Sequence, residues 1–136
     1  IKKYPHELDW KFTRVMINLT GLKEGETVCD PFCGTGTTLL EAESMGIHAI
    51  GLDFDEKMCE ISKENLTANR YKSKVFKSDF QELSKISEKF DGVVTDLPYG
   101  RSSKRSEKPE EILKKFFMIR ILKNINMIIS LQSIYL

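Results

Sequence analysis

The sequence predicts an α/β fold in which a mostly parallel sheet carries helices on both faces. Short apolar runs alternate with amphipathic segments from residue 27 to residue 96, as strands and helices do in such folds. The 136 residues, 40% of them hydrophobic, suffice to bury one core without disulfides. Because ligands bind at the carboxyl ends of parallel strands, the residues that follow each strand indicate the function.

Each predicted element has a local cause. Apolar side chains at helical spacing give a helix over residues 9–19, which Gly21 can end. Residues 27–32 predict a strand, residues 38–45 a helix that Gly46 stops, and residues 47–52 a second strand. Asp55 can cap a helix over 55–70, because its side chain can accept from the first free amides. A strand over 74–77, a helix over 81–88 and a strand over 91–96 complete the series.

The end of the chain departs from this pattern. Residues 116–136 contain no acidic residue, glycine or proline. Two interpretations stay open: one helix that packs on the sheet, or non-native sequence after a truncation or a disrupted reading frame. The later strands of the fold are expected to be missing, which leaves the fourth strand at risk of an unpaired edge. We expect one truncated domain over 1–136, with an N-terminal helical segment over 1–26 and an atypical segment over 112–136; Ile1 in place of Met indicates a piece of a longer protein.

Composition excludes several classes of protein. No apolar run reaches the roughly 18 residues of a membrane span, and no signal peptide is visible. Cys29, Cys33 and Cys59 are odd in number, which argues for a reducing, cytoplasmic setting. One C-x3-C pair without a second pair does not predict a metal site.

The net charge of +1 hides an uneven distribution. Residues 7–60 hold 11 acidic and 4 basic side chains, whereas residues 101–123 hold 8 basic and 3 acidic ones. A basic patch would therefore be local, built around Arg101, Lys104, Arg105 and Lys108. It can contact a polyanion or be a solvated loop, and both interpretations stay open.

The first predicted strand leads into Asp30-Pro-Phe-Cys-Gly-Thr-Gly36. Glycines let the backbone turn tightly and approach a ligand, and the next helix offers its free amides. A dinucleotide site needs a third glycine, where this chain has Leu39. Since a carboxylate at Asp30 would repel a phosphate, the loop suits a ligand with a positive charge. A plain turn from strand to helix is the alternative.

The next two strand ends also carry acids. Asp53 lies 17 residues beyond Gly36, close to the spacing of a ribose-binding carboxylate, and Phe54 can pack on an adenine ring. If Asp55 caps the following helix, Asp53 stays free for a ligand. Asp79, after the third strand, can accept from an adenine amino group or be an ordinary surface residue.

The fourth strand ends in Asp96-Leu-Pro-Tyr99. A carboxylate, a backbone carbonyl and an aromatic ring meet there, beside a proline that fixes the backbone. A planar exocyclic amino group needs two hydrogen-bond acceptors and a stacking surface, which this set provides. Alone, the tetrapeptide could be a turn, but four such features at four successive strand ends favour a site.

These segments resemble the successive motifs of class I S-adenosylmethionine-dependent methyltransferases, which have a Rossmann-like fold. Asp30-Pro-Phe-Cys-Gly-Thr-Gly-Thr37 with Thr95-Asp-Leu-Pro-Tyr-Gly-Arg-Ser-Ser103 is similar to RNA guanine-N2 methyltransferases. The likeness is strongest to the archaeal enzymes that modify guanosine 10 of tRNA and carry a THUMP domain. Leu97 stands where many amino-methyltransferases have proline, which favours the guanine-N2 group over DNA adenine or cytosine enzymes.

The resemblance implies S-adenosylmethionine as cofactor, tRNA as substrate and a THUMP-like RNA-binding domain in the parent chain. The implied cofactor residues are Asp30, Phe32, Gly34, Thr35, Gly36, Thr37, Asp53, Phe54, Asp79 and Phe80, and the implied catalytic residues are Asp96, Leu97, Pro98 and Tyr99. In the implied mechanism the target base leaves its stack and lies on Tyr99. Asp96 and the Leu97 carbonyl then hold the amino group, and Asp96 takes its proton.

Two other functions compete with this one. An rRNA or DNA amino-methyltransferase would differ in the nucleoside that it methylates. A cofactor-binding or scaffold fragment without activity is favoured by the missing strands and disfavoured by the intact Asp96 and Tyr99.

Overall fold

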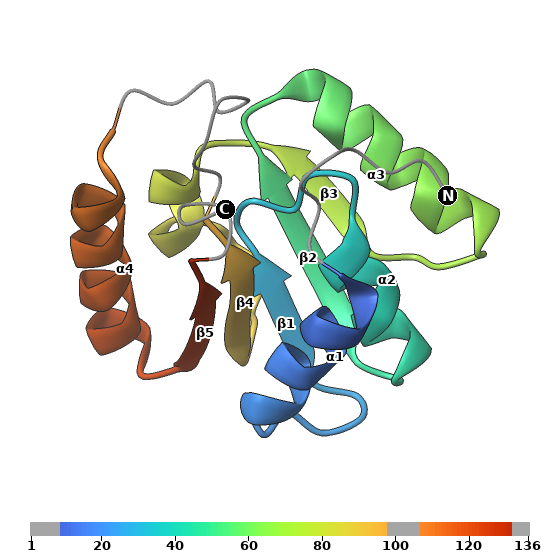
Figure 1. Ribbon diagram of the computed structural model, residues 1–136, viewed down its shortest axis with the longest axis horizontal. Helices are drawn as coiled ribbons and strands as arrows, with labels where there is room; N and C mark the ends of the chain where they lie inside the picture. Colours follow the sequence, from blue (N-terminus) through green and yellow to red (C-terminus); the bar gives the residue numbers. More distant parts are fainter. Residues whose placement is uncertain (1–8, 98–106, 132–136) are drawn as a thin grey trace.

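The computed structural model describes residues 9–97 and 107–131, and its centre is a parallel sheet of five strands in the order β3-β2-β1-β4-β5 (Figure 1). The strands are β1 (Thr27–Asp30), β2 (His48–Asp53), β3 (Lys74–Lys77), β4 (Gly92–Asp96) and β5 (Asn126–Ser130). The chain passes from β1 to β2 and β3 on one side, then crosses to β4 and β5 on the other. The order of strands therefore reverses at β1, and the predicted mostly parallel α/β fold is confirmed.

Helices cover both faces of the sheet. Those packed on the first face are α1 (Trp10–Leu19), α2 (Thr37–Ser44) and α3 (Glu56–Ala68), and those on the second are the 3-10 helix η1 (Phe80–Ser84) and α4 (Pro109–Lys123). The predicted cap of α3 is confirmed, because the Asp55 side chain accepts from the Lys57 amide at 3.0 Å. Asp9 caps α1 in the same way through Lys11.

Two apolar clusters hold the layers together. Met16 and Ile17 of α1 meet Leu39 of α2 and Val94 of β4 on the first face. On the second face η1 and α4 bury Phe80 and Phe116 against the sheet. Because β1 is covered on both sides, its last residues and the loop after it rest on a rigid support.

The expected unpaired edge of β4 is wrong. β5 pairs with β4 in parallel along its whole length, from Gly92 opposite Asn126 to Asp96 opposite Ser130. The expected single helix is also wrong over the described residues 107–131: the segment divides at Asn124, whose left-handed backbone (φ 50°) ends α4. The sheet therefore holds one strand more than the sequence predicts.

The predicted helix over 81–88 is also wrong. Only the short η1 forms, and residues 85–91 are irregular. Asp79 caps η1 by accepting from the Gln81 amide at 3.0 Å. The other predicted boundaries differ from the observed ones by at most two residues, which is the usual uncertainty at element ends.

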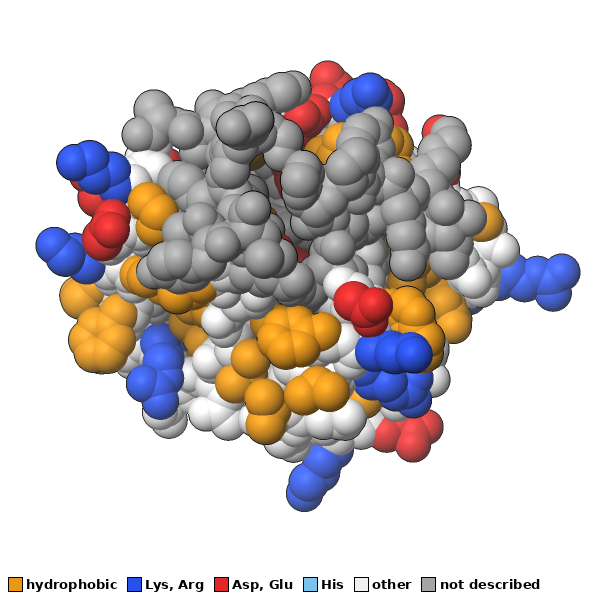
Figure 2. All heavy atoms as spheres, viewed as in Figure 1, with side chains coloured by type: hydrophobic (Ala, Val, Ile, Leu, Met, Phe, Trp, Pro, Cys, Tyr) orange, Lys and Arg blue, Asp and Glu red, His pale blue; other side chains and the backbone are white. Residues whose placement is uncertain are grey.

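The surface keeps some large apolar side chains. On α1 they include Phe12, Val15 and Leu19, and on α4 Phe117 and Leu122. Figure 2 shows hydrophobic side chains at the surface in the regions of α1 and α4. In the part of the chain that the structure describes, no helix is long and apolar enough to cross a membrane.

Candidate cofactor and acceptor site

Three aspartates end three neighbouring strands. Asp30 is the last residue of β1, Asp53 of β2 and Asp96 of β4. Since all strands are parallel and β1 lies between β2 and β4, the three carboxyl ends reach the same edge of the sheet. The order of strands reverses there, and such switch points form the crevice in which α/β proteins bind ligands.

The loop after β1 bends sharply at its two glycines. Gly34 and Gly36 have φ values of +52° and +95°, which L side chains rarely adopt. A Cβ atom at Gly34 would meet nothing within 4 Å, so the backbone borders open space there. At Gly36 a Cβ atom would lie 2.5 Å from Ser62 Oγ of α3. Glycine is therefore needed at Gly36 both for the turn and for the close approach of α3.

Helix α3 supports this loop through a residue that the sequence analysis missed. The buried Asn65 side chain donates from Nδ2 to the Thr35 carbonyl at 2.9 Å. Together with the Ser62 contact at Gly36, this bond fixes the loop from the side of α3. The sequence does contain a sign of this bond: Asn65 is a polar residue on the apolar face of the predicted helix, and a buried polar side chain needs a hydrogen-bond partner.

We expect Asn65→Ala to lower the free energy of unfolding by about 1–3 kcal/mol, because it leaves the Thr35 carbonyl without its donor in a buried place. Urea denaturation would measure the loss. Asn69→Ala is the matched control, since Asn69 donates from Nδ2 to the Asn65 carbonyl at 2.9 Å but is exposed. Equal small losses in both variants would contradict the supporting role of Asn65.

Asp53 joins the loop to the start of α3. Its Oδ2 accepts from the Gly34 amide at 3.0 Å and its Oδ1 accepts from the Asp55 amide at 2.9 Å. Asp55 caps α3 as expected, and Asp53 is itself held by two backbone amides, so its role in binding a ligand stays a prediction. Each carboxylate oxygen keeps further acceptor capacity, so Asp53 can still accept from a ligand hydroxyl.

Asp30 is buried and joins β1 to β4. Its Oδ1 accepts from the Phe32 amide at 3.0 Å and from the Thr95 hydroxyl at 2.6 Å. Burial raises the pKa of Asp30 from 3.8 to about 6, against the hydrogen bonds from Thr95, Thr38 and Phe32, and Asp53 adds to the rise. A cation nearby would reverse this shift, which is consistent with the predicted contact to a positively charged ligand.

The aromatic residues of the predicted site divide into two groups. Phe54 is 36% exposed, so its ring is accessible to a ligand. Phe80 is fully buried, and the centroid of its ring lies 5.2 Å from the ring centroid of Phe32 and 5.3 Å from that of Phe116. The Phe80 ring is therefore part of the apolar cluster on the second face of the sheet. Of the neighbouring loop residues, Thr35 is buried while Thr37 is partly exposed at the start of α2.

Only half of the predicted acceptor motif is described. Asp96 is partly exposed and Leu97 is buried, with the Leu97 amide donating to the Ser130 carbonyl of β5 at 3.0 Å. Strand β5, which the sequence did not predict, thus helps to fix the start of the motif. Outside the described residues lie Pro98, Tyr99, Arg101, Lys104 and Arg105.

The cysteines are structural in character. Cys29, Cys33 and Cys59 are free thiols, and all three are buried. Burial raises the pKa of Cys29 and Cys33 well above its ordinary value, which keeps both thiols protonated. Over residues 9–97 and 107–131, no group of three or more His, Cys, Asp or Glu side chains is placed to hold a metal ion.

Comparisons with known proteins agree with this geometry. The family model described as RMKL-like, methyltransferase domain matches residues 2–131. The tRNA (guanine(10)-N2)-dimethyltransferase of Methanothermobacter thermautotrophicus is 43% identical over 115 residues, which cover 83% of this chain and 34% of that protein. The enzyme of the same name from Methanocaldococcus jannaschii is 34% identical, over 92% of this chain and 40% of that protein.

A solved structure shares the fold. The RNA methyltransferase from Salinibacter ruber, in complex with S-adenosyl-L-homocysteine, superposes with a TM-score of 0.66 at 16% identity, over 95% of this chain and 72% of that one. The chain spans about a third to two fifths of the two archaeal relatives. Since the family model matches nearly every residue, the chain belongs to the RMKL-like methyltransferase domain family.

Proposed function

We propose that the chain binds S-adenosylmethionine and methylates the exocyclic N2 amino group of guanosine in tRNA. One observation carries the proposal: β1, β2 and β4 end in Asp30, Asp53 and Asp96 at the switch point of the sheet, next to a glycine loop. The names of the two archaeal relatives support the choice of base and of RNA.

The chain's residues fit the cofactor. Gly34 brings the backbone to open space, and Thr37 begins α2, whose first amides have no partner within the helix. Asp53 can accept from ribose hydroxyls, and Phe54 offers an accessible ring to adenine. Asp30 would attract the positive end of the ligand. When bound, S-adenosylmethionine supplies an electrophilic methyl group.

Asp96 and Leu97 would prepare the acceptor. The N2 nitrogen of guanine is a poor nucleophile because its lone pair is delocalised into the ring. Hydrogen bonds from the amino group to the Asp96 carboxylate and the Leu97 carbonyl would fix both protons and orient the lone pair. Asp96 would then take the proton that the nitrogen loses, and Tyr99 would stack against the extruded base.

The partners also belong to this proposal. A tRNA would be held partly by the basic segment around Arg101, Lys104 and Arg105, and partly by a THUMP-like domain elsewhere in the parent protein. We place the reaction in the cytoplasm, where the three free thiols would stay reduced.

A labelling experiment tests the proposal. The chain is incubated with S-adenosylmethionine that carries a radioactive methyl group and with an archaeal tRNA transcript, which is then digested to nucleosides. We expect label in N2-methylguanosine for the parent chain and its loss in Asp96→Asn, with cofactor affinity unchanged by calorimetry. Label in methyladenosine or methylcytidine would contradict the choice of base, and label at the parental rate in Asp96→Asn would contradict the role of Asp96.

A further inference from the structure

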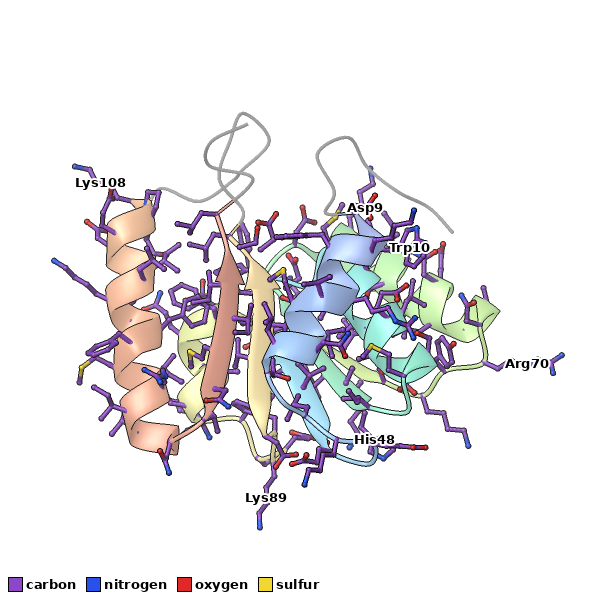
Figure 3. All side chains as sticks on the ribbon, turned by 60° about the horizontal axis from the view of Figure 1, so that its bottom comes forward. Asp9, Trp10, His48, Arg70, Lys89 and Lys108 are labelled. Atoms are coloured by element: carbon purple, nitrogen blue, oxygen red, sulfur yellow. The ribbon has the colours of Figure 1, made fainter. Side chains whose placement is uncertain are left out.

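A second candidate site lies at the other end of the sheet. A cavity of about 490 Å³ opens at the amino ends of β1, β2 and β3, far from the three aspartates. Its lining residues include His48, Arg70, Tyr71, Lys72, Lys74 and Lys89. Figure 3 shows His48 and Lys89 at the end of the molecule opposite Asp9, and Arg70 pointing into solvent.

The cations of this cavity exceed the acids that could neutralise them. Its two acids are engaged: Glu43 accepts from Ser73 Oγ at 2.5 Å, and Glu88 pairs with Lys74 at 3.5 Å. Among the described residues, none forms an ion pair with Arg70, Lys72 or Lys89. The lining therefore holds four basic and two acidic side chains, a balance of +2, and Arg70, Lys72 and Lys89 have no ion-pair partner among the described residues. A surface with this excess of positive charge is typical of anion binding.

Arg70 has an unusual backbone. Its φ of +59° places it in the left-handed region directly after α3, at a position where glycine or asparagine is normally found. A bulky residue there destabilises the fold slightly. Left-handed residues are common at helix ends, and glycine fits this position without backbone strain, so the Arg70 side chain can be removed without disturbing the turn.

Tyr71 lies beside these cations; its side chain packs partly against the first apolar cluster and stays partly exposed to the cavity. Proteins that hold single-stranded nucleic acid combine a positively charged groove with aromatic rings on which bases stack. We propose that this cavity binds a single-stranded segment of RNA, with its phosphates on Arg70, Lys72 and Lys89 and a base against Tyr71.

This inference rests on the proposed function for the choice of RNA over other polyanions. Strands of four to six residues are about 13–20 Å long, so one RNA can reach both ends of the sheet. Its path would pass β3, which is an edge strand of the sheet. The cavity would hold RNA outside the target nucleotide and contribute affinity without touching the methyl acceptor.

Fluorescence anisotropy with a labelled oligoribonucleotide of about ten nucleotides tests the inference. We expect the triple variant Arg70→Gly, Lys72→Gln, Lys89→Gln to bind at least about tenfold more weakly at low salt. The slope of the logarithm of the binding constant against the logarithm of the salt concentration should become less negative by about 2. Each phosphate contact on a single strand contributes about 0.7 to this slope, and the variant loses three contacts. The control, Lys63→Gln, Lys114→Gln, Arg120→Gln, removes the same charge from exposed positions on α3 and α4 and should keep the parental affinity. Equal weakening in both triple variants would overturn the inference.

Arg70→Gly alone separates binding from folding. Glycine tolerates the left-handed backbone, so the melting temperature should stay equal or rise while RNA affinity falls roughly threefold or more. Unchanged affinity would contradict the inference, as would displacement of the RNA by inorganic phosphate at low millimolar concentration, which would indicate a small-anion site. Cofactor binding is measured separately by calorimetry: a chain that binds cofactor but fails these RNA tests refutes only the second site.

Discussion

Asp53→Ala is expected to weaken binding of S-adenosylmethionine at least about a hundredfold. The carboxylate would accept from the ribose hydroxyls, and hydrogen bonds to a charged group contribute about 1.5–3 kcal/mol each. The substitution also releases the Gly34 amide, which Asp53 Oδ2 holds at 3.0 Å, so the glycine loop loses one of its supports. Calorimetric titration of the 136-residue chain with the cofactor measures the change in Kd.

Asp55→Ala is the matched control for this experiment. It removes a carboxylate two residues away that caps α3 through the Lys57 amide. We expect it to cost about 1 kcal/mol of stability and to leave the cofactor affinity near the parental value. The same Kd in both variants would show that Asp53 does not bind the cofactor. A parent chain that is folded by circular dichroism and shows no titration would contradict the proposed cofactor itself.

Asp30→Asn is expected to stabilise the protein above pH 6 by about 3 kcal/mol. Burial raises the pKa of Asp30 from 3.8 to about 6, so the folded protein binds a proton more readily than the unfolded chain. Between these two pH values the free energy of unfolding therefore falls as pH rises, and above pH 6 the full penalty of the buried charge is present. Asparagine keeps an oxygen that can accept from the Thr95 hydroxyl and the Phe32 amide, but it carries no charge.

Urea denaturation from pH 3.5 to 7.5 measures this effect. The parent chain should lose stability between about pH 4 and pH 6, and Asp30→Asn should lack this decline. Asp91→Asn is the control, because the exposed Asp91 accepts from the Thr27 amide at the other end of β1. Parallel pH profiles for the parent chain and Asp30→Asn would show that burial does not penalise this carboxylate.

The first four strands and three helices could be predicted because their sequence patterns differ. Strands β1 and β2 are short apolar runs, whereas α1 and α3 carry apolar side chains at helical spacing. The spacing predicted helix α1 but not its buried face, because Phe12, Val15 and Leu19 are exposed while Thr13, Met16 and Ile17 are buried. The sequence also predicted the residue that caps α3, which is Asp55.

The region after residue 107 could not be predicted, because its apolar residues do not follow one period. Helix α4 buries Ile112 and Phe116 but also exposes Phe117 and Leu122, so no single apolar face identifies it. Strand β5 begins only two residues after α4 ends, and its apolar residues continue the run, so the sequence pattern predicts a continuation of the helix. The break at Asn124 depends on one left-handed residue.

The candidate site was predictable as a set of strand ends but not as a network. Sequence order placed Asp30, Asp53 and Asp96 at carboxyl ends of strands, and the fold brings these ends to one edge. The support from Asn65 and Thr95 is a contact between distant segments, which no local pattern encodes. For the same reason the burial of Asp30 was not foreseen.

The bond between the Thr95 hydroxyl and Asp30 has a consequence for the order of folding. It joins positions 65 residues apart, and such a loop must close before the bond can form. Folding slows when native contacts are distant in sequence. Of the two strands that pair with β1, β4 is the more distant in sequence, and it is also the strand that completes the crevice. A nascent or damaged chain in which β4 has not docked would lack Asp96 and the bond that holds Asp30, so methyl transfer would require complete folding even where the residues after β1 and β2 are already in place.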